Sequence, residues 1–282
     1  MTCNLYIDGE DAFDTFGAAL LEGAYASLLT MPSFKRVYCN EWDEYDGVEP
    51  ELSAPVLNSR TLTLPMYITD ASRAASLVEH LRDNTHHSFK VPELNDRAWT
   101  LRMTANDDFV TTSEDGFAKI AISFSEDTPA VPTDKTASIA VDNIVQAAYW
   151  IDGVNLNELG CLVLKGTEGS VRKAARIRTP LSYDSVNNSG VLYDERKMHY
   201  GAKEIVIKCF IHADIEQFLA RYDTLFYKLM QPGERDFRCS NSSMAVEWMC
   251  YYKNSSINRL FVSNNGDVWC EFVITLAITC YL

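Results

Sequence analysis

The stretch Tyr6-Ile7-Asp8-Gly9 recurs as Trp150-Ile151-Asp152-Gly153, and this pair of segments decides how the rest of the chain is divided. Two glycines follow at almost the same spacing: Gly17 is matched by Gly160 and Gly47 by Gly190, each 143 positions later. Features that recur in one order at a nearly constant offset indicate a repeated structural unit. We therefore predict a tandem duplication whose two copies share few residues.

The best-matched part of the repeat is a strand followed by a helix. Residues 62–68 alternate between apolar and polar side chains, and residues 205–211 do so 143 positions later. In each copy an Asp, Asp70 or Asp214, is a candidate N-cap before apolar residues at helical spacing, and Gln217 suggests a capping box. The two apolar stripes are Ala74, Leu77, Val78, Leu81 and Ile215, Phe218, Leu219, Tyr222, Leu225, Phe226.

The rest of the chain favours β-structure. Strand patterns occupy residues 99–104, 118–124, 244–252 and 272–278, with a turn at Asn264-Asn265-Gly266. We predict an α+β fold that is mainly β, with two tandem domains. Each domain is an antiparallel β-sandwich or split barrel flanked by one α-helix. The predicted domains are 1–126 and 148–282, joined by a linker at 127–147 that contains Pro129 and Pro132.

The charge of the chain is strongly acidic and unevenly spread. The formal net charge is −14, and residues 1–141 hold 23 Asp+Glu against 10 Lys+Arg, which leaves −13 for the first half. An acidic protein is repelled by phosphate backbones, so the charge argues against a high-affinity nucleic-acid binder. The sequence has no apolar run of about 20 residues and no signal peptide at its start, so we expect a soluble protein with no membrane partner.

No motif for catalysis, a cofactor or a metal stands out. The eight cysteines form no C-x-x-C pair, and we expect reduced structural thiols. His86-His87 follows the first predicted helix and lies in a polar turn, and the spacing supplies no third metal ligand. No Gly-rich phosphate loop, nucleophile elbow or H-E-x-x-H occurs. We therefore predict no catalytic, cofactor-binding or metal-binding residues.

A long loop interrupts the sheet at the same place in each copy, at residues 40–60 and 182–202. Loops of this length are usually functional or form an interface. The acids Glu41, Asp43, Glu44 and Asp46 fail a calcium loop at its third ligand, although a pair of catalytic carboxylates is an alternative. Trp42 and Tyr45 between these acids favour an interface, with a solvated loop as the plain alternative.

Several of these motifs together resemble tailed-phage tail proteins. They are Tyr6-Ile7-Asp8-Gly9, Phe16-Gly17, the acidic-aromatic loop ending at Gly47, and Leu62-Thr63-Leu64-Pro65 before a helix. The similarity is to distal tail and baseplate-hub proteins with a tail-tube fold, typical of phages or prophages of Bacteroides-type bacteria. It covers residues 1–125 best and residues 148–282 more weakly. Distal tail proteins commonly carry a galectin-like second domain, whereas this chain looks like two tube-type copies.

The resemblance implies a ring of subunits, a trimer or a hexamer, that joins tail tube to tail tip and lines a DNA conduit. It implies other tail proteins as partners, and a virion protein made in the bacterial cytoplasm. The interface loops would contain Glu41, Trp42, Asp43 and Tyr45 in one copy and Asn187, Asn188, Val191 and Tyr193 in the other. Two alternatives remain: a carbohydrate-binding tail-tip module using Trp42, Tyr45 and Tyr193, and a cell-wall hydrolase using Glu41, Asp43 or Asp46.

Overall fold

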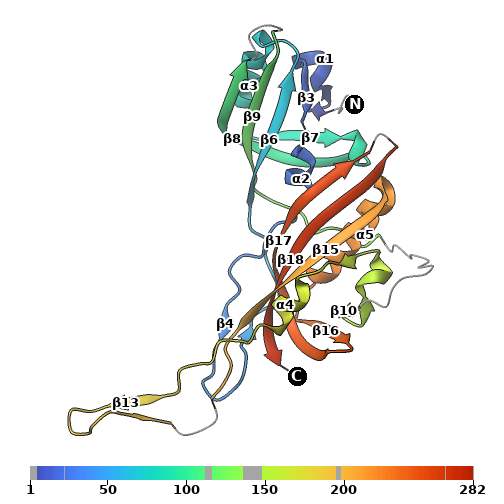
Figure 1. The fold of residues 1–282 in the computed structure, drawn as a ribbon. Helices are drawn as coiled ribbons and strands as arrows, with labels where there is room; N and C mark the ends of the chain where they lie inside the picture. Colours follow the sequence, from blue (N-terminus) through green and yellow to red (C-terminus); the bar gives the residue numbers. More distant parts are fainter. Residues whose placement is uncertain are drawn as a thin grey trace.

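Two curled antiparallel sheets of seven strands each make up most of the molecule (Figure 1). The computed structural model describes residues 5–21, 23–111, 116–135, 148–194, 198–263 and 265–281. The predicted fold class, mainly β with two tandem units, is confirmed. The domain boundaries stay predictions, and residues 136–147 of the predicted linker lie outside the described part.

The first unit holds one sheet, two short helices and one longer helix. Its strands, in spatial order, are β2 (Glu10–Asp11), β1 (Tyr6–Ile7), β7 (His87–Val91), β8 (Arg97–Thr111), β9 (Ala118–Glu126), β6 (Arg60–Ile68) and β3 (Ala18–Leu20). Its helices are α1 (Ala12–Phe16), α2 (Ala24–Leu29), α3 (Ser72–Asp83) and the 3-10 turn η1 (Pro92–Leu94).

The second unit repeats this arrangement. Its strands, in spatial order, are β11 (Val154–Asn155), β10 (Tyr149–Ile151), β16 (Arg235–Asn241), β17 (Met244–Val262), β18 (Asp267–Tyr281), β15 (Lys203–Asp214) and β12 (Leu162–Val163). Its helices are the 3-10 turn η2 (Leu156–Leu159), α4 (Thr167–Arg172) and α5 (Ile215–Leu229).

The two sheets match strand for strand, down to an irregularity in a central strand. β8 shifts register between Met103 and Ala105, and β17 shifts between Tyr252 and Asn254. Met103 faces Phe124 of β9 as Tyr252 faces Leu276 of β18. The bulge residues Thr104 and Lys253 therefore occupy equivalent places, and a β-bulge of this kind is a defined structural feature that bends the strand.

The helix-to-sheet packing follows the predicted apolar patterns. Leu64, Met66 and Ile68 of β6 and Ile205, Ile207 and Ile211 of β15 are fully buried. In α5 the Asp214 side chain accepts from the Gln217 amide at 2.9 Å, which confirms the predicted N-cap. The Gln217 side chain instead accepts from Arg221, so only half of the capping box forms. Asp70 stands one residue before the N-cap of α3, Ala71, and its carboxylate accepts from the Ser72 amide.

Three features differ from the expectations. β17 continues to Val262, whereas the predicted strand pattern ends at Tyr252. The short helices α2 and α4 carry no periodic signal, because six residues span fewer than two turns. Each long loop contains a hairpin, β4 (Cys39–Asn40) with β5 (Glu49–Pro50) and β13 (Ser182–Asp184) with β14 (Val191–Tyr193). Asn264 of the predicted turn lies outside the described residues.

The two units share one hydrophobic core cluster and touch through α5. The buried Tyr222 hydroxyl of α5 donates to the Leu29 carbonyl at the end of α2, 3.0 Å away. Next to it, the buried Asp223 carboxylate accepts from Arg97 of β8 at 2.9 Å. Among the helices of the described part, none is both long and apolar enough to cross a membrane.

Candidate functional site

Each unit has one long connecting segment, which we call its arm. The first arm connects α2 to β6, and the second arm connects α4 to β15. The first arm is residues 30–59 and the second arm is residues 173–202, of which 195–197 are not described. An isolated β-bridge closes the base of each arm, between Phe34 and Leu57 in the first arm and between Ile177 and Tyr200 in the second. Each residue of the second bridge lies 143 positions after its match in the first. The hairpins keep the offset, since Cys39 pairs with Pro50 and Ser182 with Tyr193. The two arms therefore share the same backbone pairing but lie in different surroundings.

The first arm lies along the second unit (Figure 1). The Phe34 amide donates to the Lys253 carbonyl at 3.2 Å, and the Phe34 ring meets the edge of the Tyr252 ring with 5.4 Å between centroids. Nearer the tip, the Val48 amide donates to the Thr279 carbonyl at 2.8 Å. Phe34 is consequently only 8% exposed. We call Tyr252, Lys253 and Thr279 the second-unit seat.

Gly47 shows how closely the first arm approaches its seat. A Cβ on Gly47 would lie 1.8 Å from the Thr279 carbonyl oxygen, and its φ of +85° also favours glycine. The matched Gly190 of the second arm has a similar φ of +80°, yet a Cβ there would meet nothing within 4 Å. The turn geometry is thus shared, whereas the close approach belongs to the first arm alone.

The second arm projects away from both sheets (Figure 1). Ile177, which takes the position of Phe34, is 51% exposed. The other large apolar residues exposed on this arm are Leu181, Tyr183, Val186, Val191, Leu192, Tyr193, Met198 and Tyr200. Large apolar side chains gathered in solvent on one segment are a feature of interaction sites.

The tip of the first arm meets the base of the second. The Arg178 guanidinium donates to carbonyl groups of the first arm, including that of Trp42. The Asp46 carboxylate accepts from the Tyr200 amide at 2.7 Å and lies 3.2 Å from His199 Nδ1. The structure therefore joins the two predicted loops at this point, although their tips face different surroundings.

The predicted interface residues all lie at or near the arm tips. The indole of Trp42 donates to Glu49 at 3.2 Å, and Tyr45 is 70% exposed. Glu41 and Asp43 are exposed beside Arg178, with 4.0 Å between Glu41 and the guanidinium. In the second arm the predicted residues Asn187, Asn188, Val191 and Tyr193 are exposed as well. Whether any of them contacts a partner stays a prediction.

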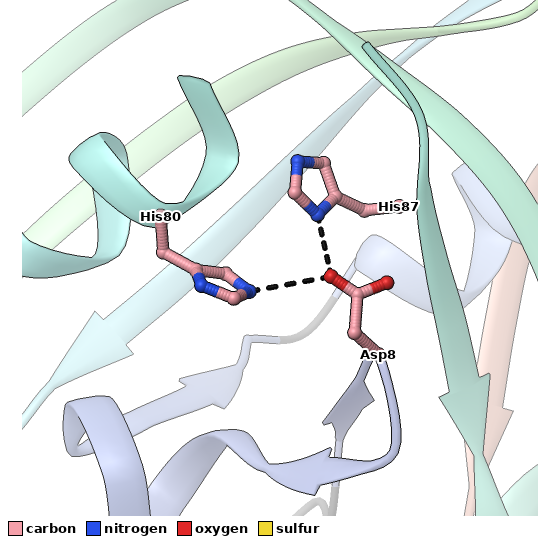
Figure 2. Close-up of side chains that lie close together, drawn as sticks. All are labelled: Asp8, His80 and His87. Carbon is pink, nitrogen blue, oxygen red and sulfur yellow. Dashed lines mark hydrogen bonds and ion pairs between the residues drawn. The ribbon is translucent and has the colours of Figure 1, made fainter. Parts of the chain in front are cut away.

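A second cluster lies in the first unit, where Asp8, His80 and His87 converge (Figure 2). Asp8 stands in the turn between β1 and β2 with a φ of 52°, His80 on α3, and His87 at the start of β7. The Asp8 Oδ2 atom lies 2.6 Å from His87 Nδ1 and 3.3 Å from His80 Nε2. The other oxygen, Oδ1, accepts from the Ser88 amide at 2.8 Å.

These contacts keep Asp8 ionised. Burial works to raise its pKa, but the hydrogen bonds from His87 and the Ser88 amide outweigh burial and hold the pKa below its usual value. His87 is fully buried, and its Nε2 atom has no hydrogen-bond partner among the described residues. A carboxylate and two imidazoles within 4.8 Å of one another are a ligand set that fits a transition-metal ion.

The sequence reasoning missed this cluster because its members come from three elements. His87 was expected in a polar turn without a third ligand; it is instead a buried strand residue, and the turn at Asp8 and the helix bring the other two ligands to it. The repeated Asp-Gly was the available signal. In the second unit the equivalent Asp152 accepts a hydrogen bond from Arg235 at 3.0 Å. Arg235 occupies the position that His87 has in the first unit.

The seven cysteines that the structure describes are free thiols. Among the described residues, Cys161, Cys209, Cys239, Cys250 and Cys270 are buried free thiols, while Cys39 and Cys280 are half-buried. Burial raises the pKa of Cys270 to about 12 and raises that of Cys250 as well. A thiol with a raised pKa is a poor nucleophile and a poor metal ligand at neutral pH. These thiols therefore behave as small apolar core residues.

Among comparisons with known proteins, the chain is similar to solved structures only. No protein-family model matches the chain, and neither does any curated protein. One of these is the crystal structure of the SPP1 Dit (gp 19.1) protein, described as a paradigm of the hub adsorption apparatus in phages that infect Gram-positive bacteria. The two chains are 14% identical with a TM-score of 0.34, and the match covers all of both. The role of this chain is therefore inferred from its own geometry.

Proposed function

We propose that this chain is a structural subunit of a phage tail, of the distal-tail or baseplate-hub class, and that its copies assemble into a ring. The observation that carries the proposal is the second arm. It keeps the backbone pairing of the first arm, but it holds its apolar side chains in solvent. Large exposed apolar side chains are stabilised by burial against a partner, at roughly 25 cal/mol per Å² of apolar surface removed from water.

The tandem units support a ring rather than a two-fold dimer. We propose that they arose by duplication, since the strand order and the arm offset are common to both. A contact between an arm and a different surface is heterologous, and such contacts close into rings or extend into filaments. Two similar units per chain would let three chains form a pseudo-sixfold ring, while six chains would form two layers or two concentric rings.

The charge distribution supports a conduit in the centre of this ring. The first half of the chain carries −13, from 23 Asp+Glu against 10 Lys+Arg, whereas the second half carries 16 against 15. A lumen lined by the acidic unit would repel the phosphate backbone, so that DNA would pass without binding. The role is mechanical, and the partners of the ring would be the neighbouring proteins of the tail.

Native mass spectrometry with negative-stain imaging, over a concentration series of the purified chain, tests the ring. The expected result is a closed trimer or hexamer with a central hole, formed in greater yield at higher concentration. A chain that stays monomeric at every concentration would contradict the proposal. Turnover of cell-wall material that disappears in Asp43→Ala would contradict a purely mechanical role.

Exposed aromatic residues favour one second candidate, a module that binds carbohydrate at the tail tip. Trp42, Tyr45 and Tyr193 are each more than half exposed, and flat exposed rings can stack on sugar faces. Titration with host glycans against the wild type and Trp42→Ala discriminates between the two functions. A binding module would lose affinity in the variant without losing assembly, whereas a ring protein would show no saturable glycan binding.

A further inference from the structure

The first-arm contact inside the chain has an equivalent surface on the first unit. Thr104 of β8 stands where Lys253 stands in β17, and Met103 where Tyr252 stands. At the end of the neighbouring strand, Glu126 faces Arg60 as Ile278 faces Lys203, which puts Asp127 in the place of Thr279. We call Met103, Thr104 and Asp127 the first-unit seat.

The two seats differ in what covers them. In the second-unit seat Tyr252 is fully buried and Thr279 is 1% exposed, because the first arm lies on both. In the first-unit seat Met103 is half-buried, Thr104 is exposed and the Asp127 side chain is 31% exposed. One chain therefore contains one arm and seat that are joined, and one arm and seat that both face solvent.

We infer that the second arm of each chain docks on the first-unit seat of another copy, in the register that the first arm uses within its own chain. This inference rests on the proposed ring and names the surfaces that build it. The Ile177 amide then donates to the Thr104 carbonyl, as Phe34 does to Lys253, and its side chain covers Met103. The Val191 amide donates to the Asp127 carbonyl, as Val48 does to Thr279.

The base of the first arm completes the contact. Within the chain, Arg178 at the base of the second arm donates to the carbonyls of Trp42 and Gly47 at the tip of the first. The residue that matches Arg178 in the first arm, 143 positions earlier, is Lys35, which is exposed. In the next copy this lysine would meet the tip carbonyls of the incoming second arm. Each arm therefore has a basic residue at the same position of its base, Lys35 in the first arm and Arg178 in the second.

Disulfide cross-linking tests the register. In the double variant Thr104→Cys/Ile177→Cys, mild oxidation should join chains into covalent dimers and larger species up to the full ring, because both cysteines lie at each contact. Each single variant should give only the background of the native thiols. As a positive control, Phe34→Cys/Lys253→Cys places the same pair within one chain and should close without any increase in mass.

A glycine variant gives a second readout that needs no cysteine. In the docked state a Cβ on Gly190 would meet the backbone at Asp127, as a Cβ on Gly47 meets Thr279. Gly190→Ala should therefore leave the chain folded and abolish assembly. The matched control is Gly266→Ala, where φ is +84° and a Cβ meets nothing within 4 Å, so that assembly should persist.

The outcomes separate this inference from the proposed function. Rings in the microscope without a covalent ladder, or rings formed by Gly190→Ala, would overturn the register and leave the ring standing. Absence of rings from the wild type would overturn both. A ladder together with the loss of rings in Gly190→Ala supports the register.

The cluster of Asp8, His80 and His87 carries a second, independent inference. Its equivalent in the other unit pairs Asp152 with Arg235, a permanent cation that cannot bind a metal. The first unit instead places two imidazoles on the carboxylate (Figure 2). The geometry points to a site for a divalent ion of the zinc class, with Asp8 Oδ2, His80 Nε2 and His87 Nδ1 as ligands.

The three ligand atoms lie within 4.8 Å of one another, so side-chain movements within that range would bring them around one ion. Ligand atoms at about 2.0–2.1 Å from a tetrahedral zinc ion lie roughly 3.3 Å from each other. The Asp8–His80 separation is already 3.3 Å, and the Asp8–His87 separation of 2.6 Å must widen when the ion replaces the shared proton. The Ser88 amide orients the carboxylate from behind, as outer hydrogen bonds do at metal sites.

Titration with Co²⁺ and Zn²⁺ on tag-free protein tests the site. The wild type should bind one ion per chain, with visible cobalt absorption that zinc displaces, and should melt at a higher temperature when zinc is added. His80→Gln should weaken binding at least tenfold, while His86→Gln, which alters a neighbouring exposed histidine paired with Asp127, should not. Equal affinity in wild type and His80→Gln, or no saturable binding by the wild type, would overturn the site.

Discussion

At the scale of single residues, the aspartate of each Asp-Gly turn accepts a hydrogen bond from the neighbouring strand of its sheet, β7 or β16, and so holds the short hairpin against that strand. Asp8 accepts from the Ser88 amide at 2.8 Å, and Asp152 accepts from the Asp236 amide at 2.9 Å. Both aspartates have positive φ, which Asp tolerates better than most residues. The repeated sequence motif therefore reflects a backbone requirement, and only the side chain paired with the aspartate differs between the units.

Asp8→Asn should destabilise the fold in a pH-dependent way. The folded pKa of Asp8 is lowered, so its contribution is present above the unfolded pKa of about 3.9 and is lost as pH falls through the folded pKa. With the side chain 33% exposed, we expect about 1 kcal/mol at pH 7. Urea unfolding of wild type and variant checks this, and a difference that persists at pH 2 would contradict the ionic origin.

At the scale of elements, the arms show how one hairpin serves two purposes. The first arm is stabilised by the second-unit seat, where backbone bonds at Phe34 and Val48 fix its register. The second arm has the same internal pairing and a far more exposed apolar surface. Its geometry is therefore set locally, by the hairpin and the isolated bridge, before any partner arrives.

Gly47→Ala should detach the first arm from its seat. The added Cβ would overlap the Thr279 carbonyl oxygen at 1.8 Å, and the backbone conformation also penalises a side chain. We expect a loss of about 2–4 kcal/mol in the free energy of unfolding. Gly266→Ala carries the same backbone penalty without the overlap and should lose only about 1 kcal/mol. Equal losses in urea titrations of the two variants would contradict the close approach.

Much of the element scale could be predicted from sequence. The alternation in β6 and β15 and the apolar stripes of α3 and α5 specify which face is buried, because each period matches its backbone geometry. The continuation of β17 past Tyr252 could not be predicted. Its polar residues pair with β18 as far as Val262, and Ser255 also donates to the Met31 carbonyl of the first arm at 3.5 Å.

At the scale of the whole molecule, α5 fastens the two units together. Asp223 is nearly buried and binds both Arg97 and Lys135, at 2.9 and 3.4 Å. A buried carboxylate requires such cations to compensate for the loss of water. The first arm adds a further link between the units, so that either unit alone would expose apolar surface that the other now covers.

The chain should therefore unfold as one cooperative unit, although its size would allow two. We expect a single calorimetric transition whose calorimetric and van't Hoff enthalpies agree. Tyr222→Phe leaves the buried Leu29 carbonyl without its donor and should lower the stability of the whole chain by about 1–3 kcal/mol. Two resolved transitions, or a variant effect confined to one of them, would contradict this coupling.

The sequence by itself determined the two-unit plan, the strand-and-helix core of each unit and the position of both arms. Those features depend on short-range periodicity and on backbone requirements at single residues such as Gly17 and Asp8, which a linear pattern records. Only the tertiary structure decided that the first arm is covered and the second is not, and that Asp8, His80 and His87 meet. Both depend on contacts between segments far apart in the chain, whose geometry no local pattern encodes.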